Sequence, residues 1–524
     1  MKKSIKAIIA VCVTAGAVSL PRLSAQTYSH DPQQACLQQE NIWLRSSNPS
    51  SIGVMDMPDV GAVRFTGTHL SGKLHRAMDT AVKNGWGFGA DSYKALRHLN
   101  LWGDFSFRNN RHTGRKWSDN FNPYNGNPYQ AGSNVKGDYI EQTFDFGVRI
   151  SSKRLFDRLW FGLGFDYSLG DLSRINDPRS RVQFADMSLT PGLIVEVARQ
   201  HRLGFHFNYR YRKEKNNKYV TKSDLYNEFF IYRQEGLGVY SKILSNRFER
   251  RVKGQWFGGG LQYEFGKTDF SLLAELLYNR HSDSIEDLIQ ESPGNWAAHE
   301  AALDLTARWK DTHSTQTILL HGAAELGSAQ KYFQEMKKEA IPGTDDYRFF
   351  YETVLEVKAF TQDKAGASLS YEYLRRKNAD ALWWIRPGIT WSYLHDRYSF
   401  YVPASDRECS SLQFSIDGVL RLLSKNRHRL YAGLSLGYLL NLSASLFLSP
   451  DINDPLIADE VIRPDYSWYT SDVARIALDL RYIFPVSKKI NGFVQLEGTE
   501  LISTSLARHN RHFADIAVGI LHRF

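Results

Sequence analysis

Strict alternation of apolar and polar residues is the feature that most constrains the fold of this chain. The segment "LGFHFNYRYR" (203–212) places leucine, phenylalanine and tyrosine on one side, and "ARIALDLRYIF" (474–484) repeats the pattern. A period of two residues belongs to a β-strand with one apolar and one polar face. Many of these runs span about ten to sixteen residues, whereas strands of soluble proteins average about five or six. A tilted strand of about ten residues crosses a bilayer, so the alternation predicts transmembrane strands.

The connections between the runs fall into two kinds. Short connections at 97–98, 200, 267–268, 310–313, 362–365 and 424–427 alternate with long polar loops at 112–138, 214–253, 327–348 and 447–469. Short turns at one end and long loops at the other are typical of outer-membrane barrels. The sequence predicts an all-β fold, a transmembrane antiparallel up-and-down β-barrel of about 18–20 strands over residues 61–524. The predicted strands are 61–71, 86–95, 99–111, 139–151, 158–170, 185–199, 201–213, 254–266, 269–281, 297–310, 315–326, 349–361, 366–376, 382–394, 397–403, 409–423, 428–446, 470–485, 489–502 and 511–524.

The first 60 residues carry a separate signal. Residues 1–25 begin with lysines, continue with an apolar run at 7–18 and end with small residues, the pattern of a signal peptide cleaved after Ala25. This signal predicts export and, together with a barrel, a location in the bacterial cell outer membrane. Residues 26–60 are expected to form a periplasmic segment and are a candidate for a small plug.

The chain ends on a strand with two distinct faces. In "HFADIAVGILHRF" (512–524), Ile516, Val518, Ile520 and Phe524 are expected to face lipid, while Asp515 lies on the opposite face. In bacterial outer-membrane barrels, the assembly machinery reads a terminal strand of this form. The expected partners are therefore outer-membrane lipid, lipopolysaccharide and the barrel-assembly machinery.

Three stretches resemble a known family. "GWGFGADSYKAL" (85–96), "NPYNGNPYQAGSNVKGDYIEQTFDFGVRIS" (122–151) and "YSLGDLSRINDPRSR" (167–181) are similar to the DUF6850 outer-membrane beta-barrel family of Bacteroidetes, whose function is unknown. The resemblance implies architecture and location. It transfers no catalytic or ligand-binding residue, because these stretches are landmarks of loops and strands without known chemistry.

The polar faces of the strands supply the candidate site. Two interpretations remain open: a lumen of mixed charge that guides a polar solute, or a paired network that rigidifies the interior. His206, Arg210 and Arg212, together with Arg475 and Arg481, are the best candidates for an anion-attracting stripe. The residues predicted to face the lumen are Asp104, Arg108, Asp166, His206, Arg210, Arg212, Glu372, Asp417, Arg421, Arg475, Asp479, Arg481, Glu497 and Asp515.

The predicted barrel is too wide for side chains alone to fill, because even 16–18-stranded porins leave a channel. Either a segment plugs the lumen or the protein conducts. The plug candidates are residues 27–60 from one end and the loop 214–253 from the other. Six tryptophans on or beside predicted strands are candidates for interfacial girdles: Trp160, Trp256, Trp309, Trp383, Trp384 and Trp391.

Other classes of function find little support. The net charge of +9 at pH 7 comes from scattered lysines and arginines without a nucleic-acid-binding motif. The sequence has no HExxH, no CxxC and no Gly-x-Ser-x-Gly motif, so neither an enzyme, a metal site nor a cofactor is expected. Cys36 and Cys409 remain after signal cleavage, and whether they pair is open.

The prediction for function is a channel, or the barrel component of a solute-uptake system, with a surface lipoprotein or a TonB-dependent receptor as a candidate partner. One alternative is a structural or interaction barrel whose loops bind a lipoprotein, a polysaccharide or a host ligand. An outer-membrane hydrolase is a minor alternative.

Overall fold

The computed structural model describes residues 41–523 apart from 56, 220–228, 245–246, 288–290, 344, 378–379, 453 and 507–508. The predicted signal peptide at 1–25, Cys36 and Phe524 lie outside this part of the chain. The cleavage site and the pairing of Cys36 with Cys409 therefore stay predictions.

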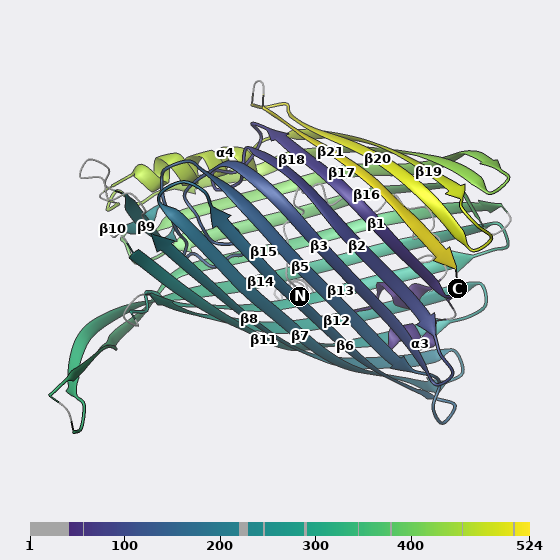
Figure 1. Cartoon of the computed structure of the whole chain (residues 1–524), viewed down its shortest axis with the longest axis horizontal. Coiled ribbons are helices and arrows are strands. Elements are labelled where there is room, and N and C mark those ends of the chain that lie inside the picture. The colour runs from purple at the N-terminus through teal and green to yellow at the C-terminus, as the bar shows by residue number, and fades with distance from the viewer. Residues whose placement is uncertain are drawn as a thin grey trace, which may run out of the picture.

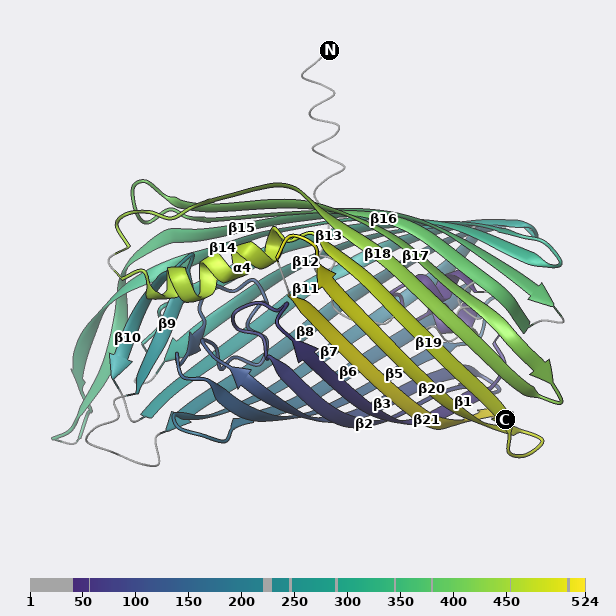
Figure 2. The same ribbon diagram turned by 90° about the horizontal axis from the view of Figure 1, so that it is seen from above.

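Eighteen antiparallel strands form one closed sheet, in which the first and last strands, β1 and β21, pair with each other (Figure 1, Figure 2). This confirms the predicted fold class. The barrel strands are β1 (Val60–Gly72), β2 (Val82–Ala95), β3 (Leu99–Arg115), β5 (Gly137–Ser152), β6 (Leu159–Arg174), β7 (Arg179–Ala198), β8 (His201–Tyr219), β11 (Arg247–Gly266), β12 (Phe270–Asp287), β13 (Gly294–Lys310), β14 (Ser314–Ala340), β15 (Tyr347–Lys377), β16 (Asp380–Tyr398), β17 (Ser405–Lys425), β18 (His428–Phe447), β19 (Val473–Pro485), β20 (Ile490–Ser503) and β21 (Asn510–Arg523).

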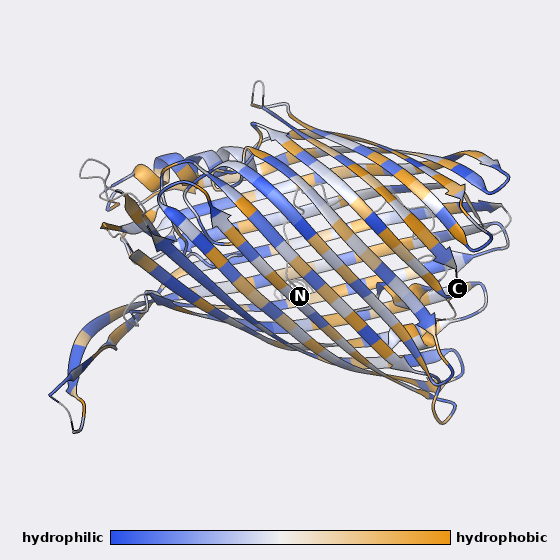
Figure 3. Ribbon diagram, viewed as in Figure 1, coloured by the Kyte–Doolittle hydropathy of each residue, from blue (hydrophilic) through white to orange (hydrophobic). Residues whose placement is uncertain are grey.

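The outer face of this wall is an apolar surface. Phe205 and Phe207 are exposed on it, while His206 between them is buried inside. On the closing strand, Ile516, Val518 and Ile520 are exposed in the same way. Figure 3 shows the resulting alternation of hydrophobic and hydrophilic residues along the strands. A closed sheet pairs every backbone N–H and C=O group of the wall, which lets such an apolar face lie in hydrocarbon.

Two predicted boundaries in the middle of the chain are wrong, and the two errors cancel. The segment 362–365 is not a turn, because β15 runs through it without a break. Its polar residues had suggested a turn, but Gln362 and Lys364 lie on the inner face, where Gln362 donates to Asp396 (2.7 Å). The strand expected at 397–403 does not form, since β16 ends at Tyr398. The prediction therefore contains two strands too many between 349 and 403. Because two is an even number, the predicted directions of the strands from β17 onward are unchanged.

The predicted long loops are folded segments at one end of the barrel, here called the long-loop end. The connections after β3 and β8 contribute a small separate sheet of β4 (Ala131–Gly132), β9 (Phe230–Gly236) and β10 (Val239–Leu244). The connection after β18 contains the π-helix η3 (Ala458–Ile462) and the α-helix α4 (Arg463–Tyr469). The expected loop 327–348 is mostly strand, because β14 and β15 continue to Ala340 and from Tyr347.

Two further short helices precede the barrel, η1 (Ile42–Arg45) and α3 (Ser51–Val54). They lie near the other end, here called the short-turn end (Figure 1). None of the helices in the described part of the chain has the length and apolar character of a membrane span.

Candidate functional site

Residues 41–55, here called the plug, lie inside the barrel at the short-turn end. Trp43 is almost fully buried, and its Nε1 donates a hydrogen bond to Glu264 on β11 (2.8 Å). Ile42, Ile52 and Met55 complete the apolar side of the plug and belong to one buried cluster with the wall residues Trp160, Ile194 and Leu273. The plug therefore packs against strands β6, β7 and β12, and the same cluster reaches Tyr93 on β2, the strand paired with β1.

Polar contacts hold the centre of the plug. The buried Asn48 side chain donates to the carbonyls of Leu193 (3.2 Å) and Phe205 (3.1 Å) and to Gln262 Oε1 (2.9 Å). The backbone and hydroxyl groups of Ser47 donate to Glu275, with a shortest distance of 2.5 Å. Polar groups of the plug thus form hydrogen bonds with carboxylate and amide side chains on the inner face of the wall.

Glycines of the wall let the plug backbone approach closely. A Cβ atom at Gly162 would lie 2.4 Å from the Ser50 nitrogen and 2.6 Å from the Pro49 carbonyl carbon. At Gly164, one step along the same inner face, the nearest atom would be Pro49 Cβ at 3.5 Å, an ordinary contact distance. Glycine is therefore required sterically at Gly162 but not at Gly164.

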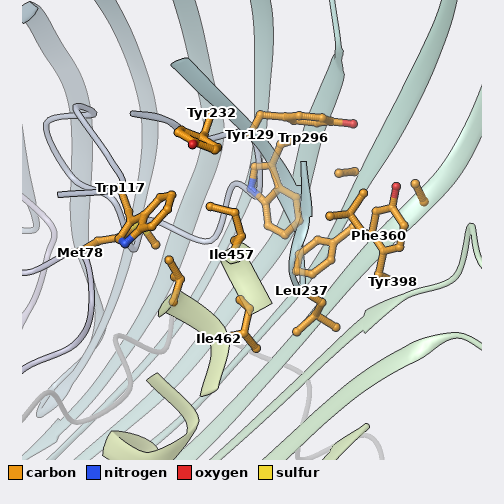
Figure 4. Close-up of a cluster of buried hydrophobic side chains, with 14 of the residues drawn as sticks. Met78, Trp117, Tyr129, Tyr232, Leu237, Trp296, Phe360, Tyr398, Ile457 and Ile462 are labelled. Atoms are coloured by element: carbon orange, nitrogen blue, oxygen red, sulfur yellow. The ribbon is translucent and has the colours of Figure 1, made fainter. Parts of the chain in front are cut away.

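The long-loop end holds a second folded structure, here called the lid, which consists of residues 116–136, 230–244 and 455–469. Figure 4 shows its apolar cluster, in which side chains of the lid meet side chains of the wall. Trp117 from the lid and Trp296 from β13 are both fully buried. Ile457 and Ile462 from the segment around η3 pack into the same cluster.

Ion pairs reinforce the contact between lid and wall. Arg250 on β11 binds Asp287 through two hydrogen bonds (2.5 and 2.7 Å) and donates to the carbonyl of Tyr129 in the lid (3.3 Å). Lys331 on β14 binds Glu235 of the lid (2.7 Å). The lid is thus fixed by a large apolar cluster and by buried charge pairs.

A buried carboxylate lies on the lid helix α4. Asp465 accepts hydrogen bonds from the Ala77 backbone N–H (2.7 Å) and the Tyr124 hydroxyl (3.3 Å). Burial raises the pKa of Asp465 to about 6, and this outweighs the opposing effects of the Ala77 hydrogen bond and of Arg76 and Arg407. The group therefore titrates close to neutral pH.

Strand β8 gives the order of these structures along the lumen. The carbonyl of Phe205 and the ring of His206 contact the plug. Further along, Arg210 and Arg212 line a cavity of about 520 Å³, here called the chamber. Glu214 then accepts a hydrogen bond from the lid backbone at Phe121 (3.2 Å). The chamber therefore lies between the plug and the lid.

The chamber carries more positive than negative charge. Its lining has seven arginines and lysines against four aspartates and glutamates, an excess of three positive charges. Four of the arginines are in ion pairs, of which the closest are Arg210 with Asp186 and Arg108 with Asp145, each 2.6 Å. The described ion pairs do not include Lys83, Arg115 or Arg511, and the guanidinium groups of Arg115 and Arg511 donate to backbone carbonyls.

A second cavity of about 260 Å³ lies beside the chamber, beneath α4. Arg76 and Tyr124 line both cavities, and the Arg76 guanidinium lies 3.5 Å from the centre of the Tyr124 ring. This stacked pair forms part of the boundary between the two spaces.

The residues predicted to face the lumen all lie at strand positions that alternate with exposed outer residues. They do not form one stripe, because β8 and β19 lie halfway around the barrel from each other. Arg210 and Arg212 line the chamber, whereas Arg475 and Arg481 lie on the opposite wall. His206 belongs to the plug contacts and is bonded to Gln262 (2.9 Å).

Most of the remaining candidates take part in polar contacts within the wall. Glu372 binds Arg45 of the plug (2.6 Å) and lies 3.6 Å from Arg386, which also binds Asp417 (2.9 Å). Asp479, Glu497 and Asp515 pair in register across three adjacent strands. Asp166 lies 3.7 Å from Arg149, and Asp104 is on the neighbouring strand beside them. Arg421 lies near the short turn after β17.

The tryptophans divide between the two faces. Trp309 and Trp383 are exposed on the outer face near the short-turn end. Trp160 is buried against the plug, Trp384 is buried inside the wall, and Trp256 stacks on His281 in the lumen with ring centres 3.9 Å apart. Three of the six candidates are therefore interior residues and not part of a girdle.

Sequence reasoning missed the partners of the plug. Gln262, Glu264 and Glu275 lie on inner positions of strands that were predicted, so the alternation could have identified them. Their contact with Asn48, Ser47 and Trp43 depends on packing between distant segments, which no local pattern encodes. Among the described residues, no three His, Cys, Asp or Glu side chains form a group suited to a metal ion.

The closed 18-stranded sheet, its apolar outer face and its folded lumen define a β-barrel of the outer-membrane type. The sequence matches the model of a family of unknown function, DUF6850, over residues 49–522, and the chain belongs to this family. The predicted family is thereby confirmed, while an origin in Bacteroidetes stays a prediction.

The solved structures that the chain matches include three with TM-scores of 0.40 or below. BauA, the ferric preacinetobactin receptor from Acinetobacter baumannii, has 9% identity and a TM-score of 0.38, covering 89% of this chain and 80% of its own. The FrpB iron transporter from Neisseria meningitidis has 8% identity and a TM-score of 0.40, covering 91% and 83%. A Pseudomonas aeruginosa FadL homologue has 12% identity and a TM-score of 0.32, covering 91% and 93%. No curated protein matches the sequence.

Proposed function

We propose that this protein is an outer-membrane barrel that admits a polar, anionic solute through a gated lumen. The short-turn end faces the periplasm and the long-loop end faces outward, as in barrels of this type. The chamber is the observation that carries the proposal. Its excess of three positive charges, in a wall that is otherwise closely paired, favours anions over cations.

The two closures explain why such a barrel would not leak. The lid separates the chamber from the outside, and the plug separates it from the periplasm. Transport then requires at least one closure to move. The plug is the better candidate for movement, because it is one short segment whose apolar cluster is smaller than that of the lid. Water can also solvate its polar wall partners after it leaves.

A single glycine tests whether the plug closes the lumen. Gly162→Ala places a Cβ atom within 2.4 Å of the plug backbone, so the plug is displaced while the outer face is untouched. We expect a clear rise in single-channel conductance in planar bilayers. Gly164→Ala makes the same chemical change one position along the inner face, at an ordinary 3.5 Å contact, and should behave like the wild type.

The charge of the chamber is tested in the opened variant. Adding Arg210→Gln to Gly162→Ala leaves Asp186 without its partner and should shift the reversal potential in a salt gradient towards cation preference. Arg386→Gln on β16, which is outside the chamber lining and loses the ion pair with Asp417 (2.9 Å), serves as the matched control. An opened channel without anion preference, or with equal shifts for both substitutions, would contradict an anionic solute. If every variant stays silent, the barrel is not a channel, and its function lies at the cell surface.

A further inference from the structure

The hairpin of β14 and β15 extends beyond the barrel wall as a two-stranded ribbon. On one side, β13 pairs with β14 only as far as Lys331, and on the other side β16 pairs with β15 only from Phe360. Residues 332–340 and 347–356, here called the ribbon, pair with each other and with no further strand in the described part of the chain. At about 3.3 Å per residue, the ribbon is roughly 30 Å long.

The ribbon leaves the rim and turns away from the barrel axis (Figure 1). Register shifts between Ala329 and Gln330 and between Phe333 and Gln334 mark two bulges at the start of this bend. A bulge bends a strand and increases its local twist. The ribbon is therefore built to lie across the direction of the wall strands and not to extend them upward.

The two faces of the ribbon differ in chemistry. One face carries Met336, Tyr347, Phe349 and Tyr351. The exposed fractions of Met336, Tyr347 and Phe349 are 59%, 51% and 50%. Lys338 lies on the same face, with its ammonium nitrogen 3.5 Å from the centre of the Tyr347 ring.

The other face carries charge. Lys337 binds Glu352 (3.2 Å) and lies 3.7 Å from Glu335, and Glu339 is paired in register with Arg348. Phe350 near the tip and the pair of Phe333 and Leu355 near the base are apolar residues on this face. The ribbon is thus amphipathic over its outer half.

The apolar face continues the outer face of the barrel wall. Even-numbered residues of β14 point outward in the wall, as the exposed Ile318, Leu320 and Leu326 show. Met336 and Lys338 follow in the same phase. Where the hairpin bends away from the barrel axis, the face that pointed outward in the wall turns towards the plane of the surrounding membrane.

We infer that the ribbon is an arm that lies on the outer surface of the membrane, with its apolar face against the lipid. Tyrosine and phenylalanine beside a lysine are typical of the interface between lipid and water, and the charged face remains in solvent. The open strand edges fit the headgroup layer, where water can satisfy their N–H and C=O groups, but not the hydrocarbon core. This inference rests on the membrane location in the proposed function.

Adjacent residues on opposite faces of the ribbon test the inference. In a chain with Cys36→Ser and Cys409→Ser, Phe349→Cys and Phe350→Cys are spin-labelled separately, and Leu320→Cys marks the lipid-facing wall. The proteins are reconstituted in vesicles of phosphatidylethanolamine and phosphatidylglycerol. Collision of the label with oxygen, which concentrates in lipid, is compared with collision with a polar nickel chelate. We expect the ratio of oxygen collisions to nickel-chelate collisions at 349 to resemble the ratio at 320. It should exceed the ratio at 350 several-fold.

The outcomes separate this inference from the proposed function. If 320 reports lipid but 349 and 350 both report water, the arm does not lie on the membrane, although the barrel remains. If 349 is shielded from both reagents, the apolar face is covered by protein and the inference is wrong. If 320 itself reports water, the membrane barrel fails. Repeating the pair with Met336→Cys and Lys337→Cys checks the result on the other strand.

Discussion

The plug and the lid close the same lumen with different kinds of contact. The plug is one short segment, anchored by the amide of Asn48, the serine contacts to Glu275 and the indole of Trp43. The lid is assembled from three separated segments around a large apolar cluster that buries Trp117 and Trp296 completely. It also depends on buried ion pairs between lid and wall, such as that of Asp119 with Lys218 on β8 (3.2 Å).

This difference suggests which closure moves first. Removing the plug exposes polar wall groups that water can solvate, so part of the lost hydrogen bonding is recovered. Removing the lid exposes large aromatic side chains and separates buried charges, for which water compensates poorly. We therefore expect the plug to open at lower free energy than the lid.

The largest effect is expected at the lid. Arg250→Ala leaves Asp287 buried without its main partner and removes a donor to the lid backbone, which should cost about 3–5 kcal/mol of lid stability. Its neighbour Arg251 is partly exposed, and Arg251→Ala should cost about 0–1 kcal/mol. Hydrogen exchange of residues 230–244 measures both. Equal protection in the two variants would mean that the ion pair does not hold the lid.

A smaller effect is expected at the plug. Asn48→Asp keeps the shape of the side chain but removes the NH₂ group that donates to Leu193, Phe205 and Gln262. The plug should lose about 1–3 kcal/mol, seen as faster hydrogen exchange of residues 41–55. Ser46→Ala is the control, since it removes a side chain with long contacts of 3.2 and 3.4 Å. If Asn48→Asp left plug exchange unchanged while Arg250→Ala loosened the lid, the plug would be the firmer closure.

The smallest effect is a pH dependence of the lid. The pKa of Asp465 is raised in the docked lid, so the docked state holds its proton more tightly than the open state does. Docking is therefore strongest at low pH and weakens as pH rises towards and through about 6. The loss should be about 1 kcal/mol between about pH 5 and about pH 7.

The control for this effect is a neutral side chain at the same position. Asp465→Asn removes the titrating group and should flatten the pH dependence of hydrogen exchange in α4. If the slope persisted in Asp465→Asn, the dependence would come from another titrating group.

The strands were predictable because each one carries its own evidence. The alternation of Phe205 and Phe207 with His206 defines the outer and inner faces without any knowledge of neighbours. The same rule explains the error at 362–365, where inner polar residues resemble a turn. Gln362 and Lys364 are polar because on the inner face they pair with Asp396 and Glu325 of the neighbouring strands.

From the sequence, the plug and the lid could be predicted only as candidate segments for the lumen. The width of the barrel implied either a segment inside it or an open channel, and residues 27–60 and 214–253 were the candidate segments. The burial of Trp117 depends on residues brought together from three loops, and local sequence does not encode that arrangement. The ribbon was missed because its charged and polar residues resemble a loop, although Tyr347, Phe349 and Tyr351 already alternate.

The plug continues directly into β1, with only residues 56–59 between Met55 and the start of that strand. A plug that leaves its site therefore stays attached to the wall. A short tether keeps a released segment at an effective concentration on the order of millimolar near its site. Reclosure is then unimolecular, its rate does not depend on how much protein the membrane holds, and a free peptide copy of the plug would compete poorly for the empty site.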